Sequence, residues 1–255
     1  MSQYLLASEH ELDRLQLQAR VWEAEASHMF DAIGVQPGWR CVDLGCGAMG
    51  VLGLLSKRTG PTGDVAGVDR DATYLAGAEH YVTSAQLANV RLLHQDVLES
   101  GLPGATFDLV HERWIMPHVD SPQALLEEMI RLAKPGGIIA IQEADQSSWH
   151  FYPPSARWPR LRNLIEAGFA LRGDINIGRR TFHMLRGAGL QDVRIRAAVV
   201  ALQDCHPYMR LPVLAGITTD GEIDELIADV ESRAANPETM VITFTVTQVW
   251  ARKPD

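Results

Sequence analysis

Three glycines at G-x-G-x-x-G spacing are the residues with the clearest chemical implication in this sequence. Gly45, Gly47 and Gly50 follow a short apolar run, residues 41–44, that is typical of a buried strand, and a helix begins after them. Glycines let the backbone bend sharply and let a ligand approach amide groups that a Cβ would shield. The amides at the start of a helix also offer donors and a partial positive charge to an anionic group. The pattern predicts a nucleotide-like ligand.

Two acidic residues near this turn narrow the choice of ligand. The same glycine spacing occurs in dinucleotide-binding proteins, and Asp69 lies at about the separation expected for an acid that binds a ribose. Asp43 comes just before the first glycine, where the charges of a pyrophosphate would be repelled. S-adenosylmethionine has no phosphate and carries a sulfonium and an ammonium group, so Asp43 favours it. An NAD-dependent oxidoreductase is the alternative class.

Five segments follow one another at strand–helix–strand intervals between about residue 38 and residue 145. They are residues 42–47 (VDLGCG), 67–71 (GVDRD), 94–97 (HQDV), 107–110 (FDLV) and 132–137 (LAKPGG). In this order they resemble the motifs of class I S-adenosylmethionine-dependent methyltransferases, in the small-molecule branch similar to ubiquinone and menaquinone methyltransferases. The other parts of the chain match only loosely, so the resemblance does not carry the substrate with it.

The resemblance implies S-adenosylmethionine as cofactor and S-adenosylhomocysteine as product. It implies that Asp69 accepts from both ribose hydroxyls, that Asp96 meets the adenine amino group and that the backbone of Val97 meets the adenine ring. Gly45 and Gly47 are expected against the methionine part, with Asp43 near its ammonium group. The complete predicted cofactor set is Asp43, Gly45, Cys46, Gly47, Asp69, Arg70, Asp96, Val97 and His111.

Strands that alternate with helices predict an α/β fold with a largely parallel sheet covered on both faces. We expect a Rossmann-like, seven-stranded sheet whose last strand, by the resemblance, runs antiparallel. The periodicity predicts one long helix over residues 9–33 with Ser8 as its N-cap, and single strands over 193–202 and 240–251. In such sheets the ligand lies beyond the carboxyl ends of the strands.

The predicted organisation has four parts. An N-terminal helical segment over the cleft comes first, then the cofactor-binding core, an inserted helical cap rich in aromatic residues, and a segment that completes the sheet. Their boundaries are residues 1–36, 37–145, 146–189 and 190–255.

Composition sets limits on partners and compartment. The formal charge is −9, which argues against a broad nucleic-acid or membrane surface, because such a surface needs a basic face. No apolar run approaches the roughly 20 residues that cross a bilayer, and the N-terminus lacks the pattern of a signal peptide. The three cysteines make no disulfide framework. We therefore expect a cytoplasmic monomer or homodimer that acts on a small molecule.

Methyl transfer from a sulfonium is an in-line displacement, so an enzyme mainly aligns the acceptor and excludes water. A base is needed only for some acceptors. The segments after the fourth and fifth strands supply Glu112, His118 and His150 as catalytic candidates, although either histidine can instead be a hydrogen-bonded packing residue. The spacing of His111, Glu112 and His118 matches no common metal motif, so no metal is predicted.

Aromatic residues in the same segments and at the N-terminus indicate an apolar or aromatic acceptor. The predicted substrate-binding residues are Tyr4, Trp114, Trp149 and Tyr152. A small-molecule methyltransferase is the leading prediction, with oxygen slightly favoured as the acceptor atom on family grounds. A cyclase-type enzyme that uses the same cofactor for other chemistry is a further alternative.

Overall fold

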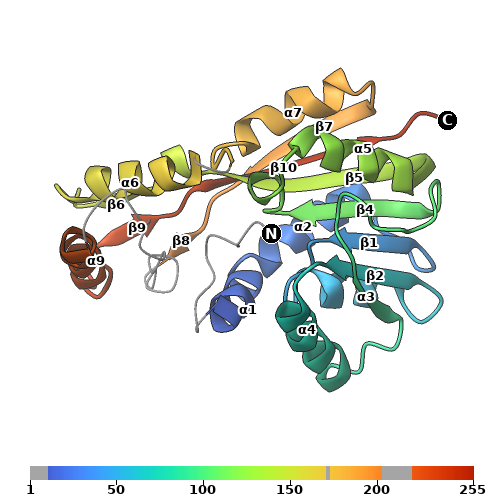
Figure 1. The fold of residues 1–255 in the computed structure, drawn as a ribbon, viewed down its shortest axis with the longest axis horizontal. Helices are drawn as coiled ribbons and strands as arrows, with labels where there is room; N and C mark the ends of the chain where they lie inside the picture. Colours follow the sequence, from blue (N-terminus) through green and yellow to red (C-terminus); the bar gives the residue numbers. More distant parts are fainter. Residues whose placement is uncertain (1–10, 171–172, 203–219) are drawn as a thin grey trace.

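The computed structural model describes residues 11–170, 173–202 and 220–255 of the chain. In this described part seven strands form one sheet in the order β3-β2-β1-β4-β5-β10-β7 (Figure 1). The strands are β1 (Arg40–Leu44), β2 (Asp64–Asp69), β3 (Val90–His94), β4 (Phe107–Arg113), β5 (Ala133–Asp145), β7 (Gln191–Ala198) and β10 (Thr245–Arg252). Neighbours from β3 to β5 are parallel, whereas β10 is antiparallel to β5 and β7. The predicted Rossmann-like fold with an antiparallel last strand is confirmed.

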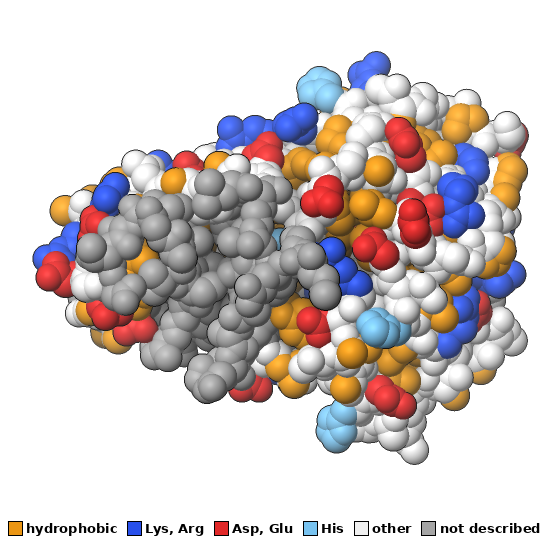
Figure 2. All heavy atoms as spheres, in the orientation of Figure 1, with side chains coloured by type: hydrophobic (Ala, Val, Ile, Leu, Met, Phe, Trp, Pro, Cys, Tyr) orange, Lys and Arg blue, Asp and Glu red, His pale blue; other side chains and the backbone are white. Residues whose placement is uncertain are grey.

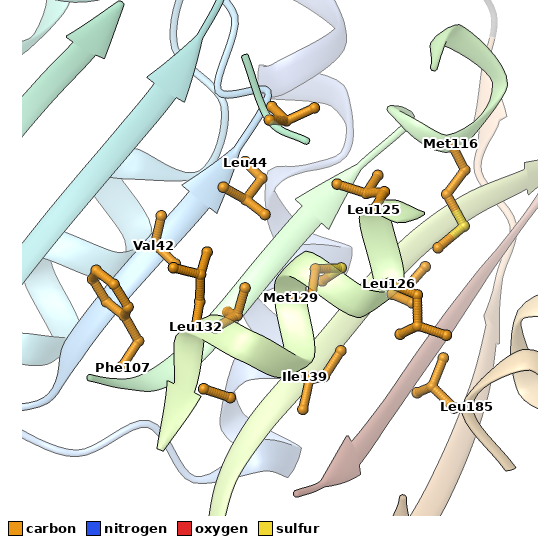
Figure 3. Packing of buried hydrophobic residues seen from close by; sticks show 14 of the residues in the cluster. Val42, Leu44, Phe107, Met116, Leu125, Leu126, Met129, Leu132, Ile139 and Leu185 are labelled. Carbon is orange, nitrogen blue, oxygen red and sulfur yellow. The ribbon is translucent and has the colours of Figure 1, made fainter. Parts of the chain in front are cut away.

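Helices cover both faces of this sheet because its buried strands alternate their side chains between two apolar cores. Cys41 packs into the core under α2 (Glu23–Ile33), α3 (Leu52–Thr59) and α4 (Ala72–Ser84), while Val42 packs into the core on the opposite face. Figure 3 shows α5 (Pro122–Leu132) laying its apolar side chains across that second face, with Leu185 of α7 (Gly178–Gly187) beside them. We call these the α2 face and the α5 face.

The sequence pairs Ser121-Pro122 and Asp71-Ala72 each predict a side-chain cap followed by a helix, and the structure contains both caps. Ser121 accepts from the amide of Ala124 at the start of α5, and Asp71 accepts from the amides of Thr73 and Tyr74 at the start of α4. Both caps satisfy amides that a helix leaves without an internal partner.

The single helix predicted over residues 9–33 is wrong in one respect, because two helices occupy this segment. They are α1 (Glu11–Val21) and α2, with Trp22 between them at φ −96° and ψ 7°. The Trp22 side chain is 1% exposed and packs with the aromatic residues described below. Packing of this large ring accounts for the break, which a helical repeat alone does not reveal. Ser8 and Tyr4 lie outside the described residues.

The strands predicted over 193–202 and 240–251 are each split in two. The first becomes β7 and β8 (Ala201–Leu202), and the second becomes β9 (Met240–Ile242) and β10. The breaks lie together, since Thr243 N donates to Val200 O at 3.1 Å. At this point both segments of the chain separate from the large sheet, and β8 and β9 join β6 (His150–Tyr152) in a three-stranded sheet of order β6-β9-β8. The predicted continuous strands missed this change of sheet.

Figure 1 shows this small sheet beyond the end of the large one, with α6 (Trp158–Ala170) and α9 (Asp220–Ala234) beside it. Its strands come from both the predicted cap and the predicted C-terminal part. The division of the chain at residues 146 and 190 stays a prediction. The sequence predicts a helix from Met49 and a strand over residues 138–142. In the structure helix α3 begins at Leu52, and β5 runs from Ala133 to Asp145, with β10 paired to its residues 138–145.

Candidate active site

The glycine turn after β1 has the backbone shape that its sequence predicts. Gly45, Gly47 and Gly50 have φ values of 74°, 55° and 50°, in the left-handed region that favours glycine. A Cβ on Gly45 would collide with the side chain of Ile115. The segment that follows β4 therefore lies directly over the first glycine of the turn.

The amides of this turn are engaged within the chain, contrary to the prediction that they face an anionic group. The amides of Gly45 and Cys46 donate to Val68 O at 2.7 and 3.0 Å, and Gly47 N donates to Asp69 Oδ2 at 2.8 Å. These bonds hold the turn against the end of β2. In this structure the turn thus contributes shape, while its first three amides are used for its own stability.

Cys46 is enclosed within the turn. Its side chain is 1% exposed, and burial raises the pKa of the thiol well above its usual range, with the charges of Asp43 and Asp69 acting in the same direction. A neutral, buried thiol is a poor nucleophile. Cys46 therefore fills space beneath the cofactor site.

Asp69 ends β2 with its carboxylate already oriented. Oδ2 accepts from Gly47 N, and Oδ1 accepts from Asp71 N at 2.9 Å. Burial raises the pKa of the carboxyl group, and the bonds from Asp71 and Gly47 oppose that shift. The side chain of Arg70 is exposed, and its carbonyl oxygen lies 3.0 Å from His94 Nε2. Asp69 therefore offers a carboxylate in a fixed orientation that can accept hydrogen bonds from a ligand.

Asp96 follows β3, the strand next to β2. The amide of Gln95 donates to Asp69 O at 3.0 Å, which ties the two strand ends together. Asp96 is exposed and accepts from Leu98 N at 2.9 Å, whereas Val97 turns into the core. Adjacent strand ends therefore carry two acids, as the sequence predicts for a site that binds a ribose and an adenine.

Asp43 is buried beneath the glycine turn and is not an exposed ligand. Its Oδ1 lies 2.7 Å from His111 Nδ1 on β4, and its Oδ2 accepts from Val51 N at 3.3 Å. Asp43 is 2% exposed and His111 is fully buried. A buried carboxylate needs such partners. Both residues therefore act on the cofactor site through the turn, which differs from the predicted direct contact of Asp43 with an ammonium group.

On the α5 face two glutamates hold the segment after β4. Glu112 Oε2 accepts from Ile115 N at 3.1 Å, and Glu143 Oε1 accepts from Met116 N at 2.8 Å. Both side chains are fully buried. Their other two oxygens, Glu112 Oε1 and Glu143 Oε2, have no hydrogen-bond partner among the described residues. Two buried carboxyl groups whose charges repel each other favour their protonated forms.

Burial is the main cause of the shifts in this glutamate pair. It raises the pKa of Glu143 to about 8, and burial together with the charge of Glu143 raises the pKa of Glu112 well above its usual range. Both carboxyl groups therefore hold a proton to a higher pH than a free glutamate does. Between them the two side chains fix Ile115 over Gly45. Enclosure and pairing make Glu112 a positioning residue for this segment, and this differs from the catalytic role predicted for it.

The two histidine candidates lie in different places. His118 is half-buried in η1 (Met116–His118), directly after the segment that covers Gly45. His150 lies on β6 of the small sheet, is exposed, and has its Nδ1 2.8 Å from Ser148 O. Of these two histidines, His118 is the one linked to the segment over Gly45, since its amide donates to Ile115 O at 2.9 Å.

The structure gathers aromatic side chains between the two sheets. Trp114 and Trp149 both approach the ring of Phe244, with centroids 6.2 and 5.7 Å away, and Trp22 stacks on it at 5.5 Å. Trp22 and Phe244 were not predicted; Trp22 showed only as one of the apolar positions of a helix. Tyr152 is 66% exposed and lies apart from this group, so its predicted role is not supported by its position.

Trp114 is also strained. Its φ of 59° lies in the left-handed region, where a bulky residue is uncommon and often marks a functional site. Its amide donates to Gln142 O at 3.0 Å, and the guanidinium of Arg113 lies 5.0 Å from its ring centroid. The strained turn aims Trp114 into the aromatic group while Ile115 points to Gly45.

Charge and metal-ligand patterns add no other site. The described residues contain no group of three or more His, Cys, Asp or Glu side chains that could hold a metal ion. Figure 2 shows acidic and basic side chains interspersed over the coloured part of the surface that faces the viewer. None of the helices in the described ranges has the length and apolar character that a membrane span requires.

The family model described as a methyltransferase domain matches residues 36–168. The chain therefore belongs to this methyltransferase family, which confirms the predicted class: a class I S-adenosylmethionine-dependent methyltransferase, with S-adenosylmethionine as cofactor. The assignment decides against the NAD-dependent oxidoreductase.

Individual relatives agree with the family. The chain is 34% identical over 114 residues to demethylmenaquinone methyltransferase of Geobacillus sp. (strain WCH70), an alignment that covers 45% of this chain and 49% of that protein. It thus spans about half the length of the curated relatives it matches. A SAM-dependent methyltransferase from Aquifex aeolicus shares the fold with a TM-score of 0.59 at 19% identity, over 97% of this chain and 99% of that one. Geranyl diphosphate C-methyltransferase from Streptomyces coelicolor A3(2) has a TM-score of 0.58 at 19% identity, over 97% and 85%.

The first prediction concerns the glycine turn. A Cβ in Gly50→Ala would collide with Asp43 Oδ2 and would lie 2.7 Å from Cys46 O. We expect stability to fall by more than the roughly 1–2 kcal/mol of a left-handed alanine, and the dissociation constant of S-adenosylhomocysteine to rise at least ~10-fold. Calorimetric titration and urea unfolding measure both effects. Gly60→Ala is the matched control, because Gly60 has a φ of 65° and nothing within 4 Å of its Cβ position. Equal affinity in the two variants would contradict the prediction.

The second prediction concerns the glutamate pair. Because the pKa of Glu143 is raised from 4.5 to about 8, the folded protein binds more protons than the unfolded chain between these values. The contribution of Glu143 to the free energy of unfolding is therefore present at low pH and is lost as pH rises toward 8. The loss is up to about 1.4 kcal/mol per pH unit for each proton. In Glu143→Gln the decline should be shallower.

Urea unfolding at pH 5, 6.5 and 8 tests this dependence. Glu79→Gln, on the exposed face of α4, is the control and should keep the slope of the unmodified protein. If Glu143→Gln declines in parallel with that control, Glu143 does not hold the proton.

Proposed function

We propose that this protein transfers the methyl group of S-adenosylmethionine to a small, largely apolar acceptor. The observation that best supports this proposal is the arrangement of residues 114–115 at the end of β4. There one short segment places Ile115 against the glycine turn and Trp114 within the aromatic group. The part of the site that we assign to the cofactor and the part that we assign to the acceptor therefore meet at two consecutive residues, Trp114 and Ile115.

The residues at the strand ends fit the cofactor. Among the described residues, the position of a Cβ on Gly47 has only Leu15 Cδ1 within 4 Å, at 3.9 Å, so these residues leave the backbone there open to close approach. Asp69 offers two oriented carboxylate oxygens for the ribose hydroxyls, and the exposed Asp96 can accept from the adenine amino group. The buried carboxylate of Asp43 lies below the turn and complements a positively charged ligand. When bound, S-adenosylmethionine supplies an electrophilic methyl group.

The aromatic group supports an apolar or aromatic acceptor. Trp22, Trp114, Trp149 and Phe244 provide large rigid surfaces that exclude water. The indole Nε1 atoms of Trp114 and Trp149 are buried without a hydrogen-bond partner among the described residues. A buried N–H without a partner is costly, and an acceptor molecule with an oxygen could satisfy such a donor. The relative named for demethylmenaquinone is consistent with this class.

Catalysis in this scheme depends on alignment first and proton transfer second. The two glutamates hold the amides of Ile115 and Met116, and Gln142 O holds that of Trp114, so the acceptor meets a pre-formed wall. His118 is our choice for the base that removes a proton from an acceptor hydroxyl, because it follows that wall directly and histidine titrates near neutral pH. Oxygen as the acceptor atom stays a prediction, as do the cytoplasmic location and the monomeric or homodimeric state.

The cyclase-type alternative makes a different product from the same cofactor. Incubation with S-adenosylmethionine labelled in the methyl group decides between them, since a methyltransferase places the intact labelled methyl group on the acceptor. A panel of phenols, quinols and prenyl alcohols is the first set of acceptors. Label found as a new ring carbon in the product, and in none of the panel as a methyl group, would overturn the proposal.

The third prediction tests the ribose-binding acid. In Asp69→Ala two charge-assisted hydrogen bonds to the cofactor are lost, so binding of S-adenosylhomocysteine should weaken by at least ~2 kcal/mol. Asp64→Ala, at the opposite end of the same strand β2, should bind as the unmodified protein does. Calorimetry measures both. An unchanged dissociation constant in Asp69→Ala would remove Asp69 from the ribose site.

The fourth prediction concerns the base. His118→Ala should slow turnover by about 10²-fold or more, with little change in the dissociation constant of S-adenosylhomocysteine. His80→Ala, exposed on α4, serves as the control. Turnover is measured from pH 6 to 9 with the acceptor that the panel identifies. If His118→Ala retains the rate of the unmodified protein across this range, His118 is not the base.

A further inference from the structure

A row of buried polar side chains crosses the α2 face of the large sheet and ends at the glycine turn. Asp43 Oδ1 lies 2.7 Å from His111 Nδ1, and His111 Nε2 lies 2.8 Å from Gln142 Nε2. Gln248 Nε2 donates to Gln142 Oε1 at 2.8 Å, and Arg196 Nη1 donates to Gln248 Oε1 at 2.8 Å. We call these five residues the relay. They lie on five adjacent strands, β1, β4, β5, β10 and β7.

Strand register brings the members of the relay together. Asp43 is paired with His111, Gln142 with Gln248, and Gln248 with Arg196. Directly opposed residues lie on the same face of a sheet, within reach of each other's side chains. The four members from Asp43 to Gln248 are at most 2% exposed, so they sit in a medium where each hydrogen bond depends on its neighbours.

The chemistry of the groups gives the relay a single direction. The guanidinium of Arg196 can only donate, so Gln248 must present its oxygen to Arg196 and its nitrogen to Gln142. The carbonyl oxygen of Glu25, which can only accept, independently places the Gln248 nitrogen on that side, at 2.9 Å. Gln142 then presents its oxygen to Gln248 and its nitrogen to His111.

An amide nitrogen cannot accept a hydrogen bond, so His111 Nε2 must be the acceptor and carries no proton. The proton of the neutral ring is on Nδ1 and is donated to Asp43. The partner on one ring nitrogen thus sets the state of the other. The relay is anchored at its outer end by the ion pair of Arg196 Nη2 with Glu25 Oε2 at 2.5 Å.

The inner end of the relay acts on the cofactor site. With Oδ1 bound to His111, Asp43 Oδ2 is aimed at Val51 N and lies under Gly50, where a Cβ would collide with it. Because His111 is neutral, the negative charge of Asp43 is not cancelled by a positive ring beside it. The turn is thereby held in shape over a carboxylate whose histidine partner is a neutral ring.

We propose that Gln142, Gln248 and Arg196 are positioning residues of the cofactor site, which hold His111 in its neutral Nδ1–H form and thereby keep Asp43 oriented beneath the glycine turn without a positive charge beside it. This inference rests on the proposed function for the identity of the ligand. Gln248 and Arg196 belong to strands far along the chain from the turn, so the C-terminal part of the sheet helps to set cofactor affinity.

Gln142→Glu tests the proposal by changing one atom type in the relay. One oxygen of the new carboxylate still accepts from Gln248, but the other faces His111 Nε2 and requires a proton there. We expect His111 to become doubly protonated, which places a positive charge beside Asp43. The dissociation constant of S-adenosylhomocysteine should then rise at least ~10-fold.

Two readouts follow the change. Nuclear magnetic resonance of protein labelled with ¹⁵N-histidine at pH 7.5 reports the proton on each ring nitrogen, with His111 identified as the signal that is absent from His111→Asn. Calorimetry with S-adenosylhomocysteine reports affinity. Gln142→Met, which removes the donor without adding an acceptor, should lose the single Nδ1–H form and weaken binding, and it carries the test if Gln142→Glu does not fold.

Thr247→Val is the matched control for lost hydrogen bonds. Thr247 lies next to Gln248 on the opposite face and donates to the carbonyl oxygens of Glu143 and Gly178. Its loss should lower stability while leaving His111 and the cofactor affinity unchanged.

Three results would overturn the proposal. They are a proton on His111 Nε2 in the unmodified protein, an unchanged affinity in both Gln142 variants, and an equal loss of affinity in Thr247→Val. Failure of the unmodified protein to bind S-adenosylhomocysteine would overturn the proposed function itself, and the state of His111 would still decide the direction of the relay.

Discussion

The buried charge of Asp43 is the constraint on which the cofactor side of this molecule depends. A carboxylate at 2% exposure is tolerated only with hydrogen-bond donors on its oxygens. One donor comes from the turn itself, at Val51 N, and the other from His111 on the neighbouring strand. The turn and the sheet are therefore joined at this residue, and the shape of the glycine turn depends on polar partners several strands away.

Strands β4 and β5 build two separate polar systems because consecutive residues of a strand point to opposite faces. His111 and Gln142 face α2 and belong to the relay. The next residues along each strand, Glu112 and Glu143, face α5 and hold the segment that follows β4. The relay holds the glycine turn through Asp43. The glutamate pair holds the segment that contains Ile115, which covers Gly45.

The sequence predicted the core of the fold well because its information there is local. Glycines, strand-end acids and helix caps act within a few residues of themselves, so the turn, Asp69, Asp96 and the caps at Ser121 and Asp71 were accessible. The relay was not. Gln142, Gln248 and Arg196 meet only through the register of antiparallel β10, and a glutamine in a strand gives no sign of its partner. Likewise nothing local distinguishes β9 from β10, because both have β-forming residues and the break reflects a change of sheet.

The group of aromatic side chains could not be predicted in the same way, because it depends on contacts between segments that are distant in the sequence. Its members come from the helix break at Trp22, the strained turn at Trp114, the segment before β6 and the link between β9 and β10. No short motif records such a group, and each member is joined to the cofactor core by a separate segment. The aromatic surface proposed for the acceptor can therefore change by substitutions in three places, Trp22, Trp149 and Phe244, without disturbing the glycine turn. Trp114 is the exception, since its neighbours Arg113 and Ile115 both contact the turn. A change at this position acts on cofactor and acceptor together.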